Sequence, residues 1–173
     1  MRLAYTMALG RGDTDLLLLG LAADLSARGV RCAGTVQINS ERADSGQCDM
    51  DVRVLPDGPV LRISQHLGLS ARGCRLDPDA LERAVGLVAA RLSRGADILI
   101  VNKFGKHEAE GRGFRDVIAE AVALDIPVLV GLNALNRSAF EAFAGGLACR
   151  LPPERAALRD WAVAVTAETA CVR

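Results

Sequence analysis

Short apolar runs alternate with segments of helical periodicity along most of the chain, and this alternation is the strongest constraint on its fold. Continuous apolar runs are typical of strands buried in a parallel sheet, whereas leucine and alanine at helical spacing indicate amphipathic helices. The pattern predicts an α/β fold, doubly wound, with a mainly parallel sheet and helices on both faces. Strands are expected at 3–9, 30–38, 97–102, 126–132 and 147–150, and helices at 13–28, 77–93, 114–124, 137–144 and 153–169.

One segment departs from this alternation. The sequence DVRVLPDGPVLRIS, at 51–64, has two alternating strands around a Pro-Asp-Gly turn, and it predicts an inserted β-hairpin. No repeat, low-complexity stretch or linker interrupts the chain. We therefore expect residues 1–173 to form a single domain.

Composition excludes several classes of partner. The chain carries 21 basic and 21 acidic residues and only 3% aromatic residues, so neither a basic surface nor a base-stacking platform is expected. No apolar run approaches the ~20 residues of a membrane span. The five cysteines form no CxxC pair and are typical of reduced thiols in a cytoplasmic protein. Cys32 and Cys149 fall in expected strands, whereas Cys48 and Cys74 fall in polar loops where a thiol could be reactive.

Ligands of doubly wound folds bind at the carboxyl ends of the strands, which directs attention to four loops. These loops are 10–15, 37–50, 103–113 and 131–137. The first follows a strand and opens a helix, which is the setting of the phosphate-binding pattern G-x-x-x-x-G-K-[ST]. We expect the ligand site of this chain among these loops.

The segment Met7–Thr14 matches that pattern only in part. Gly12 and Thr14 agree with it, but Met7 replaces the first glycine and Asp13 replaces the lysine that contacts phosphate. Two unit charges ~4 Å apart at an effective permittivity of 20 interact by roughly 4 kcal/mol, so exchanging lysine for aspartate converts a strong attraction into a repulsion.

The expected strand at 97–102 shows the opposite exchange. A nucleotide hydrolase places carboxylates after this strand to hold Mg²⁺, but here the pair is Asn102-Lys103. Two interpretations remain open. Asp13 and Lys103 could form an ion pair that neutralises the site, or Asp13 could cap the first helix while Lys103 is solvated.

The segment 102–116 combines cations, anions and glycines. Gly111 and Gly113 flank Arg112 before an expected helix, so backbone amides and a guanidinium would meet at a helix N-terminus that could bind an anion. The alternative is an exposed charged loop. His107 with its acidic neighbours matches no established metal-site spacing, and no metal is expected. A further group, Ser64, Gln65 and Arg72, would suit an oxyanion such as phosphate or molybdate, or would belong to an ordinary surface loop.

With these residues in place, the chain resembles an uncharacterised bacterial family, a domain-of-unknown-function group similar to P-loop nucleoside triphosphatases. The resemblance covers about residues 10–132 and is carried by RGDTDLLLLGLAADLSARGVRCAG, CDMDVRVL, ISQHLGLSARGCRLD and, most specifically, VNKFGKHEAEGRGF. It implies a P-loop-like fold and, through the association of this family with molybdate-transport genes, a role in molybdenum handling. Met7, Asp13, Asn102 and Lys103 depart from the positions on which hydrolysis depends, so the resemblance does not imply catalysis.

Three functions follow from these observations. The first is a non-hydrolytic protein that binds a small oxyanion, molybdate or tungstate, or a phosphate-bearing ligand. The second is a divergent nucleoside triphosphatase or nucleotide-binding protein in which Arg11, Lys103 or Lys106 replaces the lysine, and Glu108 or Glu110 replaces the Mg²⁺ ligand. The third is a scaffold, such as a homo-oligomer, with a degenerate site. The candidate ligand-binding residues are Gly10, Arg11, Gly12, Asp13, Thr14, Ser64, Gln65, Arg72, Asn102, Lys103, Lys106, Glu108 and Arg112.

Overall fold

The computed structural model describes residues 2–41, 48–65 and 75–170. Its strands are β1 (Leu3–Thr6), β2 (Cys32–Glu41), β3 (Cys48–Val54), β4 (Val60–Arg62), β5 (Ile98–Phe104), β6 (Val128–Leu132) and β7 (Ala148–Leu151). Its helices are α1 (Asp13–Ala27), α2 (Pro78–Leu92), α3 (Lys106–Ala109), α4 (Arg115–Ala123), α5 (Arg137–Ala144) and α6 (Arg155–Ala170), with the 3-10 turn η1 (Ala134–Asn136) before α5.

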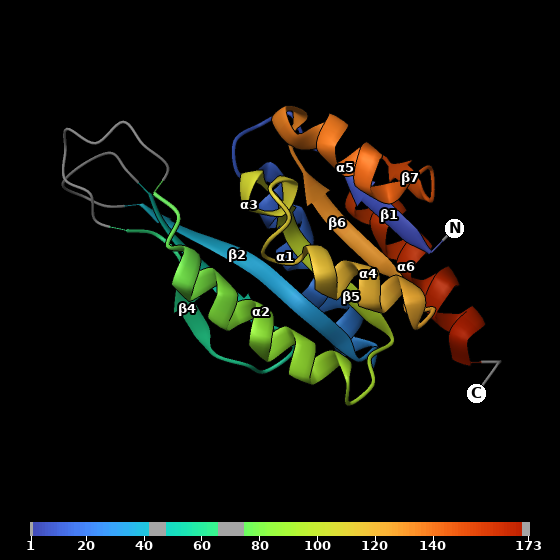
Figure 1. Cartoon of the computed structure of the whole chain (residues 1–173). Helices are drawn as coiled ribbons and strands as arrows, with labels where there is room; N and C mark the ends of the chain where they lie inside the picture. Colours follow the sequence, from blue (N-terminus) through green and yellow to red (C-terminus); the bar gives the residue numbers. More distant parts are fainter. Residues whose placement is uncertain (1, 42–47, 66–74, 171–173) are drawn as a thin grey trace.

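The strands form one seven-stranded sheet in the order β4-β3-β2-β5-β6-β1-β7 (Figure 1). The five strands from β2 to β7 in this order run parallel, and β3 and β4 extend the sheet as antiparallel strands beside β2. Both the mainly parallel α/β sheet and the inserted hairpin are confirmed. In the sheet, β1 and β5 lie on either side of β6. Because the three strands run parallel, the loops that follow β1 and β5 lie at the same edge of the sheet.

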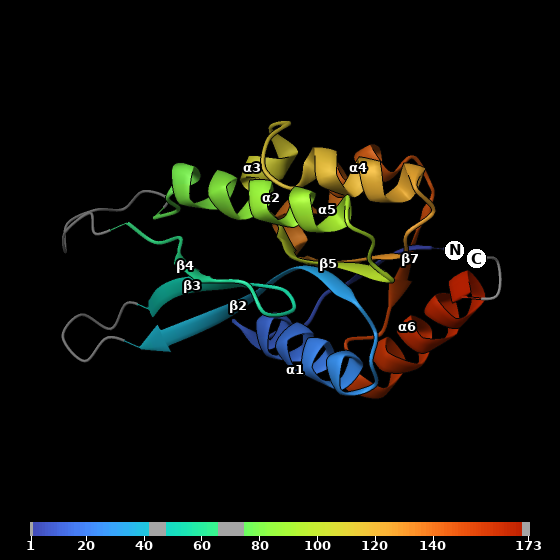
Figure 2. The ribbon, with the colours of Figure 1, turned by 90° about the horizontal axis from the view of Figure 1, so that it is seen from below.

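Helices cover both faces of the sheet, as the alternating sequence pattern predicts. Figure 2 shows α1 and α6 on one face and α2, α3, α4 and α5 on the other. One apolar core packs the sheet against α2, α4 and α5, around Phe104, Ile118 and Phe140. A second core packs the opposite face against α1 and α6, around Leu18 and Leu158. Burial of these two apolar layers holds the first-turn residues of α1 against the carboxyl ends of the strands.

Three local features differ from the sequence-based expectation. β2 continues to Glu41, three residues past the predicted end, because it pairs with β3 along its whole outer half. β5 continues through Lys103 to Phe104, so Asn102 lies inside a strand and is only 4% exposed. Cys48 is the first residue of β3 and does not lie in a loop, whereas Cys74 lies outside the described residues.

The main chains of β5 and β6 approach closely at their carboxyl ends. A Cβ atom added at Gly131 would collide with the carbonyl oxygen of Asn102, so this position accepts only glycine without a backbone shift. The close approach fixes the main chain of Asn102 at the edge where the candidate site lies. No helix within the described residues is long and apolar enough to cross a membrane.

Candidate functional site

The connection between β1 and α1 keeps the form of a phosphate-binding loop in its second half. Gly12 is the N-cap of α1 and adopts a left-handed conformation, φ +84°, and no side chain caps the helix. The amide of Leu16 donates to the carbonyl of Gly12, which begins the helical ladder. The prediction that Asp13 caps α1 is wrong. A capping side chain belongs to the N-cap residue in an extended conformation, and here that position is held by Gly12.

Contacts of the Thr14 and Asp13 side chains join the end of this loop to its earlier residues. The hydroxyl of Thr14 accepts a hydrogen bond of 3.0 Å from the amide of Ala8. The carboxylate of Asp13 lies against Gly10, where an added Cβ would collide with it. Arg11 is exposed at the tip of the loop, and among the residues that the structure describes it makes no ion pair. The loop therefore carries one exposed cation, Arg11, and one carboxylate, that of Asp13, which is folded back against Gly10.

The predicted ion pair between Asp13 and Lys103 is also wrong. Both residues are described and exposed, and neither takes part in an ion pair within the described chain. The strand pairing of β5 is irregular between Val101 and Phe104, and within this stretch Asn102 contacts α1 through its side chain.

Asn102 instead joins α1 to the sheet through Asp15. Its Nδ2 donates to Oδ1 of Asp15 at 2.8 Å, and its Oδ1 accepts from the backbone amide of Gln37 at 2.9 Å. The other carboxylate oxygen of Asp15 accepts from Nδ2 of Asn39 at 2.7 Å and from Nε2 of Gln37 at 3.4 Å. We call Asp15, Gln37, Asn39 and Asn102 the amide network. It connects α1, β2 and β5 at the carboxyl edge of the sheet.

The amide network leaves no carboxylate available at the position where a hydrolase holds Mg²⁺. Both oxygens of Asp15 accept hydrogen bonds from amides, and both polar atoms of the Asn102 side chain are bonded. Among residues 2–41, 48–65 and 75–170, no group of three or more His, Cys, Asp or Glu side chains is arranged to hold a metal. The network also lies next to the loop, because the nearest atom to a Cβ built on Gly12 is Nδ2 of Asn39, at 3.8 Å.

The segment between Gly105 and Phe114 is not an open charged loop. It contains the short helix α3, in which His107 and Glu108 are buried. Oε2 of Glu108 accepts from the amide of Gly105 at 2.8 Å, and Oε1 accepts from the amide of Phe114 at 3.3 Å. The carboxylate therefore closes the segment on itself. This use of both oxygens corrects the interpretation of Glu108 as an accessible ligand.

The anion site expected before α4 is occupied by the protein's own carboxylates. Oε1 of Glu82, on α2, accepts from the amide of Gly113 at 3.0 Å and lies 2.9 Å from Nε2 of His107. Together with the bond from Phe114 to Glu108, these contacts consume the amides that precede the helix. The sequence identified the donors correctly, but their acceptors come from α2 and α3.

Lys106 and Arg112 share one exposed anion, Glu110. Nη2 of Arg112 lies 2.5 Å from Oε2 of Glu110, and Nζ of Lys106 lies 3.6 Å from its Oε1. The hydrogen bond from Arg112 is the main cause that lowers the pKa of Glu110. These cations therefore form a surface ion-pair cluster with Glu110 and are not two unpaired cations.

The remaining predicted residues lie near the end of the hairpin. The hydroxyl of Ser64 accepts from the amide of Met50 at 3.1 Å, and the amide of Gln65 donates to the carbonyl of Arg75 at 2.7 Å. Arg72 lies outside the described residues. These hydrogen bonds therefore join the residues after β4 to β3 and to the segment that precedes α2.

Comparison with known proteins identifies the family. The family model described as "Protein of unknown function (DUF2478)" matches residues 3–161. The chain belongs to this family. The uncharacterised family expected from the sequence is thus confirmed, over nearly the whole chain.

The DUF2478 chain is also similar to one protein in sequence and to one solved structure in fold. It is 36% identical over 160 residues to a protein of Bradyrhizobium diazoefficiens named molybdenum import ATP-binding protein ModC 2, and the match covers 92% of this chain and 18% of that protein. The chain thus spans less than a fifth of the length of this relative. The fold is similar to the solution structure of a human cancer-related nucleoside triphosphatase, with a TM-score of 0.58 and 17% identity over 100% of this chain and 98% of that one. The P-loop-like α/β fold is confirmed.

Within this DUF2478 fold, the structure brings together the 7–14 loop and Asn102 through the amide network, whereas Ser64 and Gln65 bond to Met50 and Arg75. The sequence reasoning missed Asp15, Gln37 and Asn39. One signal was present, because Asp15 follows Asp13 in the first turn of a helix and Gln37 opens one of the four loops at the carboxyl edge. The length of β2 was the missing information, since it decides which of its polar residues reach α1.

Proposed function

We propose that this DUF2478 chain binds a small oxyanion, molybdate or tungstate first, at the loop between β1 and α1, and does so without hydrolysing nucleotides. The donors would be the amides of Thr14 and Asp15 in the first turn of α1, since the amide of Asp13 already donates to the carbonyl of Gly10 at 3.4 Å. A helix leaves its first amides without intrahelical partners, and α1 has no capping side chain to satisfy them. Gly12, as N-cap, adds no side chain that would obstruct an anion at this end.

Cationic charge for such an anion would come from Arg11 and Lys103. Both side chains are exposed, and in the described part of the chain neither is neutralised by an ion pair. Lys106 and Arg112, in contrast, are already paired with Glu110. The proposal therefore assigns ligand binding to the first loop and its neighbour at the end of β5, with Arg11 as the principal cation.

The state of Asn102 is the observation that carries the proposal of binding without hydrolysis. Where a magnesium-dependent hydrolase has a carboxylate, this chain has an amide that is buried and bonded to Asp15 and Gln37. Asp13 at the lysine position removes the second requirement of triphosphate chemistry. The relative whose name refers to molybdenum import supports the choice of molybdate as the first ligand to test.

Nucleotide binding is a second candidate, and a hollow beside the loop favours it. The hollow has a volume of about 550 Å³ and lies between the loop, α1 and the connection to α6. Its apolar lining includes Leu9, Leu16, Leu17 and Pro153, and Leu9 is fully exposed. A mainly apolar hollow beside the proposed anion site suits a molecule that has both a flat ring and a phosphate.

Titration calorimetry on the purified chain distinguishes these functions. Molybdate, tungstate, sulfate, phosphate, ATP and GTP are each titrated with and without Mg²⁺, and inorganic phosphate release is followed in parallel. The proposal predicts heat of binding with an oxyanion, no Mg²⁺ dependence and no phosphate release. The variant Arg11→Ala should weaken binding by about tenfold, since it removes a charged partner worth ~1.4 kcal/mol or more.

A matched control is Arg83→Ala, because Arg83 is exposed on α2 at the opposite face of the sheet (Figure 2). It should leave affinity unchanged. Binding of ATP or GTP alone, without turnover, would favour the second candidate. If no ligand binds, the chain acts as a scaffold, and the proposed function is wrong.

A further inference from the structure

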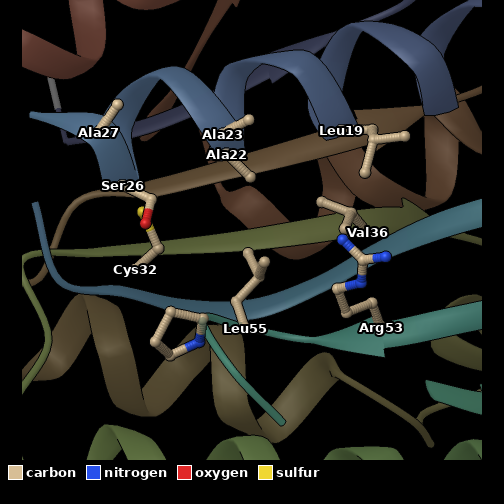
Figure 3. A pocket seen from close by; sticks show the side chains of 10 residues that line it. Leu19, Ala22, Ala23, Ser26, Ala27, Cys32, Val36, Arg53 and Leu55 are labelled. Carbon is tan, nitrogen blue, oxygen red and sulfur yellow. The ribbon is translucent and has the colours of Figure 1, made fainter. Parts of the chain in front are cut away.

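A second concave site lies along the other half of α1, away from the loop. It is a groove of about 430 Å³ between α1, β2 and the end of β3. Leu19, Ala22, Ala23, Ser26 and Ala27 of α1 form one wall. The opposite side is made of Cys32, Val36, Arg53, Leu55 and Pro56. Figure 3 shows the side chains of Cys32, Val36, Arg53 and Leu55 facing α1 across the groove.

The groove is lined mostly by apolar side chains, with Ser26 and Arg53 as its polar members. Its α1 wall consists mainly of alanines, whose small side chains leave open the space that larger residues would fill. Val36 and Leu55 are buried beneath it. Cys32 is also buried, and this burial raises the pKa of its thiol to about 12, with a further contribution from Asp97. The groove's volume lies in the range of small-molecule sites, about 300–1,000 Å³.

Arg53 places a single positive charge on this apolar surface. In the sheet register it stands opposite Val36 of β2 and Val60 of β4, so neither cross-strand neighbour can neutralise it. The carboxylate two residues earlier, Asp51, is bonded to Arg62 at 2.5 Å. Within the described part of the chain, the side chain of Arg53 makes no ion pair and no hydrogen bond.

The position of Arg53 relates this charge to the groove. Figure 3 shows its guanidinium beside Val36, on the side of the strands that faces α1. A guanidinium offers a rigid fork of donors that matches a carboxylate with two parallel hydrogen bonds. An apolar surface with one such fork at its margin suits a molecule with a hydrocarbon body and one carboxylate.

We propose that this groove binds a small apolar carboxylate, with its hydrocarbon part between α1 and β2 and its carboxylate on Arg53. The site is separate from the loop at the start of α1 and does not depend on the function proposed for it. A longer amphipathic helix of a partner would require apolar surface beyond the groove. The outward face of β3 next to Arg53 instead carries Asp49 and Asp51, both paired with Arg62.

Octanoate and octanol make a matched pair of probes, because they share the same hydrocarbon chain and differ in the charged group. Binding is followed by calorimetry and by amide NMR spectra of the full chain. Octanoate should bind and should shift the amide signals of groove residues such as Val36 and Leu55. Arg53→Gln should weaken octanoate by about tenfold or more, because it removes a charge-assisted bidentate contact, while octanol changes less than about twofold.

Two further variants distinguish binding in the groove from a general effect of the protein's charge. Ala23→Phe places a ring in the groove from an exposed position of α1, and it should weaken both probes. Arg83→Gln removes an equivalent exposed cation on α2 and should change neither.

The proposal is overturned by any of three results: no octanoate binding, equal octanoate affinity of Arg53→Gln and the parent protein, or shifted signals that lie elsewhere. It is also overturned if sedimentation shows a dimer that Ala23→Phe dissociates, because the groove would then be covered by a second copy of the chain.

Discussion

The substitution Asn102→Asp tests the amide network directly, because it returns a carboxylate to the position where a hydrolase has one. The new carboxylate would face Oδ1 of Asp15, which is now 2.8 Å from Nδ2 of Asn102. At that distance two charges at an effective permittivity of 20 repel by about 6 kcal/mol. Protonation of one carboxyl costs less. The folded variant should therefore hold one extra proton between the two groups.

That proton sets the size and the pH dependence of the loss in stability. Protonating an aspartate of ordinary pKa near 3.9 costs ~4 kcal/mol at pH 7 and ~1.5 kcal/mol at pH 5. Because the folded state binds the proton more tightly than the unfolded state, the variant should regain stability as the pH falls through this range. The free energy of unfolding in urea, measured at both pH values for the variant and the parent protein, gives the two differences.

Asn133→Asp is the matched control. Asn133 caps the start of η1, where its Oδ1 accepts from the amide of Asn136, and a carboxylate can do the same. This change should stay within ~0.5 kcal/mol at both pH values. If Asn102→Asp behaves like Asn133→Asp, Asn102 does not contact Asp15, and the network described above is wrong.

Three further predictions concern side chains to which the structure gives a specific role. Asp15→Ala should lower the free energy of unfolding by about 2–3 kcal/mol because it leaves amide donors without an acceptor, whereas Asp13→Ala should stay within ~0.5 kcal/mol in the same urea titration. Glu108→Gln should cost about 1–3 kcal/mol because an amide can accept from only one of its two backbone partners, and Glu120→Gln on the exposed face of α4 should be neutral. Cys32, whose pKa is raised by burial to about 12, should resist iodoacetamide at pH 8 in the folded protein and react once unfolded, as peptide mass mapping would show. Since its ordinary pKa is 9.0, its contribution to stability should be complete below pH 9 and lost as the pH rises toward 12.

The fold was predictable from the sequence because the apolar pattern of its strands differs from the apolar pattern of its helices. The apolar runs of β5 and β6 and the helical spacing of α1 and α2 each match one pattern only, so their type and approximate position followed. Strand ends were less predictable. β5 runs on past Val101 because Phe104 pairs again with Leu132 of β6, after an irregularity in the pairing that contains Asn102 and Lys103.

The candidate site was predictable only as a location. Loop positions at the carboxyl edge follow from topology, and the structure places the 7–14 loop and Asn102 there. Which polar groups pair across that edge depends on distances between elements far apart in the chain, and sequence does not supply these. Asp13 was therefore assigned a partner that it lacks, while Asp15, two residues later, forms the network.

The 105–114 segment shows the same limit for charged residues. Its residue pattern alone does not distinguish one cation or anion of the segment from another. Burial separates them, because Glu108 is 3% exposed and bonded to two backbone amides, whereas Lys106 is exposed at the surface. A buried carboxylate is kept in place by its hydrogen bonds and is a structural element of the segment.

The central claim is that the first loop holds an anion but has lost triphosphate hydrolysis. Its most direct test is one experiment on the unmodified chain, in which heat of binding and release of inorganic phosphate are recorded together for molybdate and for ATP with Mg²⁺. The account predicts saturable heat with molybdate and no phosphate above the rate of a protein-free sample. Release of phosphate from ATP in proportion to protein concentration would contradict it.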